Sequence, residues 1–552
     1  MESIEFMKIN YKVKRDLLDE LIENEENRGT IRVGEIPRGN IGKKKINVES
    51  GNKITEKIKD IVLSPEEIKE IHRNIDKIDK KYEDIARSLG YVIEPQFTWN
   101  AIVDSIENHK IKASDFQDMF EAFHKHAKRN TDSEQEFANV FFDVNLGDTR
   151  LGSGTNERAK ALNDIVLMIN EFDFKDESGH DILGDVYEYL IGQFAANAGK
   201  KGGEFYTPHE VSQILARLVT DHVDKHETQF RVYDPTMGSG SLLLTVQRVF
   251  SGSDISKVEF YGQELNTTTY NLARMNLMMH GVSYANMNLK RADTLDRDWP
   301  FATQNGIEVP KKFDAVVANP PYSQNWDIKN IDREKDVRFK GFGVAPASKA
   351  DYAFVLHGLH HLDEKGTMAI VLPHGVLFRG ASEGKIRENI LKENLLDAVI
   401  GLPANLFYGT SIPTVVLVFK GREARGDRKD VLFIDASKEF EKGKNKNTLS
   451  EENINKIVET YHNREDVDKY AHVATIEEIK ENDYNLNIPR YVDTFEEEEV
   501  VPLTDIAREL NEIQTNIDET TKSLMSMLDD LVGTTPEAQS ELEEFRKLFG
   551  SN

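Results

Sequence analysis

A doubly wound α/β domain, with a helical region before it and a helical tail after it, is the fold that the sequence predicts. From about residue 229 to about 436, short segments rich in β-branched residues alternate with helical stretches. The segments read FRVYD, VEFYGQE, LKRAD, FDAVVANP, GTMAIVLP, LLDAVIGLP, TVVLVFK and DVLFID. Such alternation favours a mostly parallel sheet with helices on both faces. We place the α/β domain, with the helix that leads into it, at residues 181–440.

The region before the α/β domain is predicted from helical spacing. In residues 61–180, Ser64 and Pro65 mark a helix start, with proline in the first turn. Apolar residues then recur at helical intervals, as Ile68, Ile71, Ile75, Ile78 and Ile85. Further helices are expected over 158–198, where one face carries Leu183, Val186, Tyr187 and Leu190. Residues 1–60 are lysine-rich and broken by proline and glycine, so we expect an irregular basic extension there.

The region after the α/β domain, residues 441–552, is polar and then regains a regular pattern. Apolar residues recur in steps of three and four, with Thr520 as one interruption: Leu503, Ile506, Leu510, Ile513, Ile517, Leu524, Met527 and Leu531. Heptads of this kind predict a helix that packs along another helix. Its position after a polar stretch favours a contact with a partner subunit. The alternative is a helix that lies on its own domain.

Composition excludes several classes of protein. The chain of 552 residues contains no cysteine, which removes disulfides, thiolate zinc sites and cysteine nucleophiles. It shows no apolar run of transmembrane length and no signal peptide at its start, so we expect a cytoplasmic protein. Its net charge is −26, whereas a protein that wraps nucleic acid alone is usually basic. Either a partner subunit supplies much of the affinity for nucleic acid, or the acidic residues serve only solubility.

The first motif is a glycine turn between the predicted strand FRVYD and a helix. It runs from Asp234 through Ser239 and Gly240 to Ser241. Glycines at such a turn let the backbone approach a ligand, and the helix N-terminus offers unpaired N–H groups. The spacing is neither GxGxxG nor GxxxxGK[ST], which argues against a dinucleotide site and an ATPase. A glycine turn that only packs strand against helix is the alternative.

Two acidic residues end the next two predicted strands. Glu264 closes VEFYGQE, where a carboxylate suits hydrogen bonds to ribose hydroxyls. Asp293 closes LKRAD and could accept a hydrogen bond from the adenine amino group of a bound cofactor. The alternatives are a solvated acid for Glu264 and a helix cap for Asp293.

The motif at the end of FDAVVA carries the candidate chemistry. It consists of Asn319, Pro320, Pro321 and Tyr322. The amide oxygen of Asn319 and the carbonyl of Pro320 can accept hydrogen bonds from an amino group. These bonds localise the lone pair of the amino nitrogen and stabilise the positive charge that develops on it as it attacks. The prolines stiffen the loop, and Tyr322 can stack on a base rotated out of a duplex. An ordinary Asn-Pro turn fits this setting poorly.

A last motif precedes a predicted helix, EVSQILARLV. It comprises Glu204, Phe205, Tyr206, Thr207, Pro208 and His209. Taken alone, it favours a loop and helix start, with Thr207 as the cap and Pro208 in the first turn.

Along the chain, the FYTP loop comes first, the glycine turn second and NPPY third. This order resembles that of adenine-N6 amino-methyltransferases of the gamma arrangement. More narrowly, GEFYTPHEV, YDPTMGSGSLLL, GQELNTTTYNLARMNLMMHG, VVANPPYS and KADYAFVLHGLHHL look like the modification subunit of type I restriction–modification systems, over roughly residues 150–490. The resemblance implies a methyltransferase fold and S-adenosylmethionine bound by Glu204 to His209, the glycine turn and Glu264. It also implies that Asn319 to Tyr322 hold the target adenine and that no metal is needed.

The resemblance also implies partners. Members act on double-stranded DNA, as two modification subunits on one specificity subunit, and a restriction subunit joins in some systems. The C-terminal heptads then fit docking onto the specificity subunit, and residues 1–60 are a solvated tail or a DNA-contacting arm. This extension departs from the apolar, helical start of the family. The alternatives are cytosine-N4 methylation, glutamine methylation on a protein, and a non-catalytic scaffold.

Overall fold

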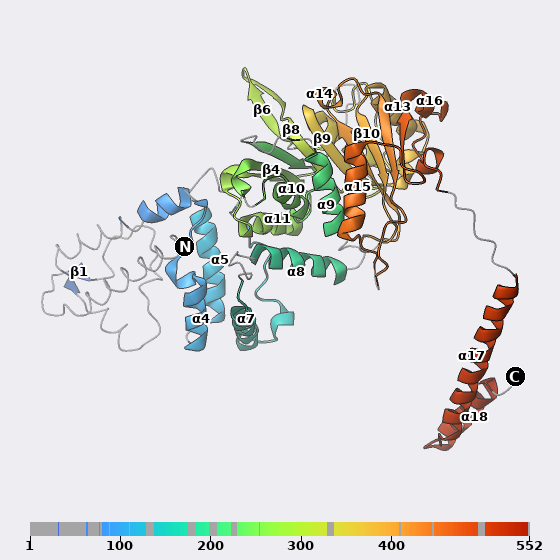
Figure 1. Cartoon of the computed structure of the whole chain (residues 1–552). Helices are drawn as coiled ribbons and strands as arrows, with labels where there is room; N and C mark the ends of the chain where they lie inside the picture. Colours follow the sequence, from blue (N-terminus) through green and yellow to red (C-terminus); the bar gives the residue numbers. More distant parts are fainter. Residues whose placement is uncertain are drawn as a thin grey trace. The chain divides into compact units, whose positions relative to one another are not determined.

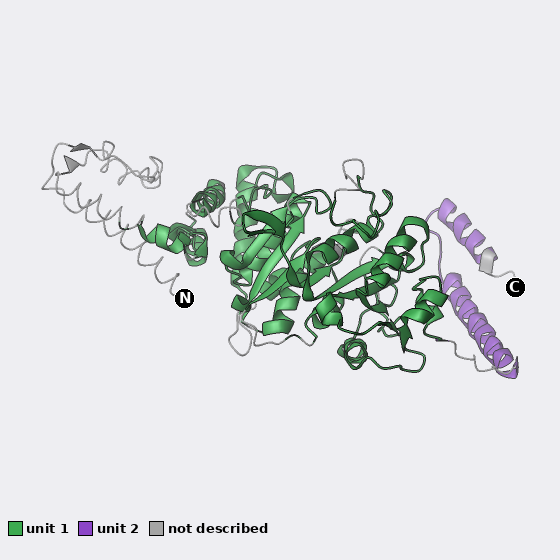
Figure 2. Ribbon diagram, turned by 90° about the horizontal axis from the view of Figure 1, so that it is seen from above, with its two compact units in different colours: residues 1–493 green, residues 494–552 purple. Residues whose placement is uncertain are grey.

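The computed structural model describes two compact units, residues 1–493 and 494–552, which are considered separately (Figure 2). The described residues are 31–32, 62–63, 77, 80–87, 89–109, 111–128, 137, 139–174, 183–197, 207–221, 223, 229–252, 254–297, 299–327, 336–407, 410–443, 446–494 and 503–549. Most of residues 1–60, and with them the predicted basic extension, lie outside this set. So do Glu204, Phe205 and Tyr206 of the predicted cofactor motif, and the predicted helix start at residues 64–76.

The centre of the first unit is a nine-stranded sheet with the order β13-β12-β10-β11-β9-β8-β3-β4-β5 (Figure 1). Its strands are β3 (Phe230–Asp234), β4 (Val258–Glu264), β5 (Met287–Arg291), β8 (Phe313–Ala318), β9 (Leu362–Pro373), β10 (Leu396–Gly401), β11 (Thr414–Lys420), β12 (Asp430–Asp435) and β13 (Ala471–Thr475). All eight predicted strands are present. The third ends at Arg291, two residues before the predicted boundary.

The sheet is mostly parallel, as predicted. β5, β4, β3, β8 and β9 run in one direction, whereas β11 and β13 pair antiparallel with their neighbours. The edge strand β13 lies in a charged stretch that gave no strand signal. The same holds for the hairpin β6 (Phe301–Gln304) and β7 (Ile307–Pro310), which pairs outside the main sheet around Asn305-Gly306. A separate short pair, β1 (Ile31–Arg32) and β2 (Val62–Leu63), is also antiparallel.

Helices cover both faces of the sheet, which confirms the doubly wound architecture. One hydrophobic core joins the sheet to α9 (His209–Val219), α10 (Ser241–Ser251), α11 (Thr267–Met279) and α15 (Glu451–Asn463). The other joins it to α12 (Asp351–His361), α13 (Ala381–Lys392) and α16 (Ile476–Glu481). Neighbouring residues alternate between the cores: Val232 faces the first and Tyr233 the second. The short α14 (Arg422–Arg425) follows β11.

The predicted helical region before the sheet contains α4 (Trp99–Glu107), α5 (Ala113–Ala127), α7 (Thr155–Asn170) and α8 (Leu183–Asn197). Ile102, Ile106 and Phe116 form a small core between α4, α5 and α7, whereas α8 packs against α11. On α8, Leu190 is exposed, so the face predicted from spacing is only partly covered. No helix among the described residues is long and apolar enough to cross a bilayer.

The second unit holds the predicted heptad helix, α17 (Leu503–Asp529), followed by α18 (Pro536–Phe549). The Arg546 guanidinium donates to the carbonyls of Leu528 and Leu531, and Leu528 is buried. Most of the heptad stripe is not covered within this unit: Leu510, Ile513 and Ile517 are 61%, 55% and 52% exposed.

Candidate active site

The predicted site residues meet at one edge of the sheet. Because β8, β3, β4 and β5 are parallel neighbours, their carboxyl ends share an edge. Asn319 follows β8, Asp234 ends β3 and Glu264 ends β4. The topology therefore brings together residues that lie up to 85 positions apart in the chain, from Asp234 to Asn319.

The Asn319 carboxamide is hydrogen-bonded at both ends. Its Nδ2 donates to Thr207 Oγ1 at 3.1 Å, and its Oδ1 accepts from the Tyr322 hydroxyl at 2.9 Å. Asn319 and Tyr322 are half-buried, while Pro320 is buried. Burial, and then the nearby Asp351 carboxylate, raise the pKa of Tyr322, so its hydroxyl keeps its proton and donates. Asn319 thus presents an amide oxygen to a donor, as amino-group chemistry requires.

Thr207 belongs to this site and does not cap the following helix. The helix α9 begins at His209, its N-cap is Pro208, and no side chain caps it. The capping alternative for Thr207 is therefore wrong, because its hydroxyl is directed to Asn319 instead. His209 is exposed and lies 3.5 Å from Gln213, ring Nε2 to amide Nε2.

The backbone after Tyr322 is held by a buried ion pair that the sequence reasoning left without a role. Ser323 has a φ of 50°, and its N–H donates to the Asp351 carboxylate at 2.7 Å. Asp351 is fully buried and pairs with Arg379, which also binds Glu383 at 2.6 Å. The only signal in the sequence was the KADYAF stretch noted for the resemblance, which contains Asp351.

An aromatic side chain that the sequence reasoning also missed borders the site. The Phe407 ring is buried and lies edge-on to Tyr322, with 6.1 Å between ring centroids. It precedes β11 by seven positions, in a loop that carries no strong motif on its own.

The glycine turn has left-handed backbone at two positions and is closely packed. Gly238 and Gly240 have φ values of 55° and 77°, which explains why glycine stands at both positions. A Cβ on Gly240 would also come within 2.7 Å of a Leu277 side-chain carbon. The buried Ser239 and Ser241 hydroxyls are 3.1 Å apart, and Asn276 Nδ2 donates to the Ser239 carbonyl at 3.0 Å.

Two carboxylates flank this turn, and the pKa of each is raised. Burial raises the pKa of Asp234 to about 7, with repulsion from Glu264 adding to it, although the Thr236 N–H donates to it at 2.8 Å. Burial also raises the pKa of Glu264, against hydrogen bonds from the N–H groups of Asn266, Gly238 and Leu265. A cationic ligand with hydrogen-bond donors would be favoured here, because it would offset the cost of two partly desolvated negative charges.

Asp293 lies at the same edge but is exposed. Its Oδ1 accepts the N–H of Leu295 at 3.0 Å, so it stabilises the turn after β5. No helix begins directly after Asp293 among the described residues, so this contact closes a turn and the helix-cap alternative is not borne out. The predicted contact with the adenine amino group of a cofactor stays a prediction.

Comparison with known proteins adds independent findings. Residues 178–500 match the family described as N-6 DNA Methylase. The chain is 39% identical over 451 residues to the methylase subunit of the type I restriction enzyme MpnII of Mycoplasma pneumoniae, covering 79% of this chain and 81% of that one. It is 32% identical over 446 residues to the MjaVII methylase subunit of Methanocaldococcus jannaschii, covering 79% and 71%.

A solved structure is also similar. The type I restriction–modification methyltransferase subunit of Streptococcus thermophilus shares 45% identity with this chain, with a TM-score of 0.68. The match covers 77% of this chain and 85% of that one.

Proposed function

This chain belongs to the N-6 DNA methylase family, as a type I restriction–modification methyltransferase subunit, and we propose that it methylates the exocyclic amino group of adenine at Asn319 to Tyr322. The observation that carries the assignment of the site is the Asn319 carboxamide, whose oxygen accepts a hydrogen bond at the carboxyl edge of the sheet. An adenine amino group is a donor that can take the place of the Tyr322 hydroxyl.

The proposed mechanism rests on two acceptors. The amino lone pair of adenine is delocalised into the ring, which makes the nitrogen a poor nucleophile. Asn319 Oδ1 and the Pro320 carbonyl accept hydrogen bonds from the two N–H groups, localise the lone pair and stabilise the developing positive charge. Tyr322, released from Asn319, stacks on the base after it leaves the duplex. Once it carries the methyl group, the amino nitrogen is positively charged and loses a proton to solvent, which leaves the neutral methylamino product.

The residues of the glycine turn fit S-adenosylmethionine, which supplies an electrophilic methyl group when bound. Burial raises the pKa of the Asp234 and Glu264 carboxyl groups. As carboxylates, they suit the ammonium group and the ribose hydroxyls of this cofactor. Ser239, Gly240 and Ser241 belong to the same glycine turn. Thr207, Pro208 and His209 complete the set among the described residues, and Asp293 is the proposed contact for the cofactor's adenine.

The raised pKa of Asp234 makes cofactor binding pH-dependent. An ammonium group binds the charged carboxylate, which is present above a pKa of about 7 and is progressively protonated below it. The Kd for S-adenosylmethionine is therefore expected to rise about tenfold per pH unit below 7. Calorimetric titration at pH 5.5 to 8.5 measures this. Asp234→Asn should bind weakly at every pH, and a wild-type Kd that is flat across this range would contradict the assignment.

The proposed reaction is tested by the identity of its product. The chain is incubated with its specificity subunit, duplex DNA and methyl-labelled cofactor, and the nucleosides are then separated. N6-methyladenine is expected. N4-methylcytosine alone would refute the choice of base, and label on protein but not DNA would refute the substrate.

We propose that this subunit works within an assembly of two such chains on one specificity subunit, with DNA and, in some systems, a restriction subunit. Relatives are named as subunits, and the chain's net charge of −26 suits DNA recognition by another chain. The exposed stripe of Leu510, Ile513 and Ile517 on α17 is the proposed contact with the specificity subunit.

Changing this stripe should weaken assembly. Leu510→Asp with Ile513→Asp removes two apolar side chains, each contributing about 1.5–3 kcal/mol when buried. The Kd for the specificity subunit should therefore rise by at least about a hundredfold. Analytical ultracentrifugation measures it. Thr515→Asp, on the opposite side of α17, is the matched control and should assemble normally. Unchanged assembly of the double variant would contradict docking through α17.

A further inference from the structure

We infer that Thr207 orients the Asn319 carboxamide for the reaction, a role separate from contact with the cofactor and one that rests on the proposed function. A carboxamide has one accepting end and one donating end, and the amino group of a target base can be bound productively only by the oxygen. The opposite orientation would place NH₂ against NH₂. Something must therefore bind the Nδ2 end, and in this structure it is the Thr207 hydroxyl, at 3.1 Å.

The hydrogen bond does more than set orientation. When Thr207 Oγ1 accepts from Nδ2–H, it favours the amide resonance form with more negative charge on Oδ1. Hydrogen bonds in series polarise one another in this way. Asn319 Oδ1 then accepts more strongly from the amino group, and most strongly when that group becomes positively charged. The contact is thus worth more in the transition state than in the ground state, which is the condition for a faster reaction.

Thr207 is placed firmly enough to do this. It is followed by Pro208, which is buried, and the Pro208 carbonyl accepts the N–H of Ser212 in the first turn of α9. Val211 and Ile214 of this helix are fully buried in the core. Orientation matters because a misplaced catalytic group can cost about a hundredfold in rate.

The other end of the loop is fixed independently. The buried Asp351 carboxylate, itself paired with Arg379, holds the N–H of Ser323. Asp351 therefore holds the loop backbone. Once the target amino group has displaced the Tyr322 hydroxyl from Oδ1, Thr207 is the described partner that orients the Asn319 carboxamide.

The experiment compares Thr207→Val, which removes the hydroxyl at nearly constant shape, with Thr207→Ser, which keeps it. In the complex with the specificity subunit, the single-turnover rate at saturating S-adenosylmethionine is expected to fall at least about tenfold in Thr207→Val. It should return to within about threefold of wild type in Thr207→Ser. Because the rate is measured at saturating S-adenosylmethionine, a change in cofactor Kd does not enter either value. Thr460→Val, which removes a half-buried hydroxyl from α15, is the matched control.

Other results would overturn the inference. An unchanged single-turnover rate in Thr207→Val would overturn the orienting role, and a rise in cofactor Kd alone would leave Thr207 as a cofactor ligand only. Failure of serine to restore the rate would show that shape matters instead of the hydroxyl. If a thermal unfolding measurement shows that Thr207→Val is not folded, Thr207→Ala is used in its place, with the same expected results. A wild-type complex that makes no N6-methyladenine would instead refute the proposed function, which keeps the two failures distinct.

Discussion

Replacing Asn319 with alanine is expected to lower the single-turnover rate of methyl transfer by at least about 10²–10³-fold. The change removes the oxygen that we propose accepts from the amino group, and with it the proposed charge stabilisation in the transition state. The Kd for S-adenosylmethionine should stay within about threefold of wild type, because Asp234 and Glu264 end different strands from the one that leads to Asn319. Quench-flow with labelled cofactor measures the rate, and equilibrium dialysis the affinity.

The control for this change is Asn482→Ala. Asn482 is half-buried, and its Nδ2 donates to the Glu478 carbonyl at 3.2 Å in α16. It has the same size as Asn319 and is likewise hydrogen-bonded at both ends of its carboxamide, since Arg490 donates to its Oδ1 at 3.2 Å. No predicted site residue lies in that helix. A methylation rate for Asn319→Ala equal to that of Asn482→Ala would remove Asn319 from the mechanism.

Much of the fold could be predicted because its strands are strongly patterned. Strands such as β8 and β11 are buried runs of valine, alanine and leucine between polar turns, and each was predicted within a few residues. The edge strand β13 was not. Its residues AHVAT are only partly buried, and it is held by pairing with β12 more than by its own hydrophobicity.

The candidate site could also be predicted only in part. Asn319, Asp234 and Glu264 could be predicted because each follows or ends a recognisable strand, and parallel strands bring such residues to one edge. The contacts of Thr207 and Asp351 could not. They depend on side chains meeting across 112 and 28 positions of chain, and no local pattern encodes a partner at that distance.

The buried carboxylate of Asp397 is the second place where one substitution is expected to have a large effect. Asp397 is fully buried near the start of β10. Tyr461 donates to its Oδ2 at 2.8 Å. Four cationic side chains approach it: Arg425, which donates to Oδ1, Arg464 at 3.3 Å, Lys420 at 3.7 Å and Arg428 at 3.7 Å. Burial alone would raise the pKa of Asp397, but Arg464, Lys420 and Arg425 outweigh it, so the pKa is lowered.

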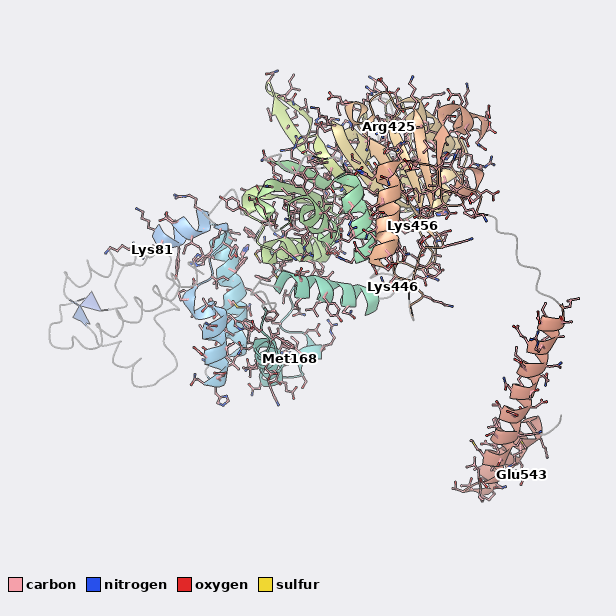
Figure 3. The ribbon with its side chains drawn as sticks, in the orientation of Figure 1. Lys81, Met168, Arg425, Lys446, Lys456 and Glu543 are labelled. Atoms are coloured by element: carbon pink, nitrogen blue, oxygen red, sulfur yellow. The ribbon has the colours of Figure 1, made fainter. Side chains whose placement is uncertain are left out.

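This cluster is remote from the proposed chemistry. It lies near the amino end of β10, whereas the predicted site residues gather at the carboxyl ends of the parallel strands. Arg425 and Lys446, both labelled in Figure 3, mark opposite ends of the α/β domain. Lys446 lies 3.5 Å from Glu210 in the first turn of α9, beside the Thr207 end of the site. A change at Asp397 should therefore act on stability and not on the reaction.

Asp397→Ala is expected to lower the free energy of unfolding by about 3–5 kcal/mol, because it leaves buried cations uncompensated. Urea unfolding followed by tryptophan fluorescence measures this, because two of the three tryptophans of the chain, Trp299 and Trp326, lie in the α/β domain. Since the folded pKa is lowered, the wild-type advantage is complete above the unfolded value of about 3.9 and is lost as the pH falls further. Asp254→Ala, which removes an exposed pair with Lys257, should cost less than about 1 kcal/mol. Equal losses in the two variants would mean that Asp397 and its cations contribute no more than a surface ion pair.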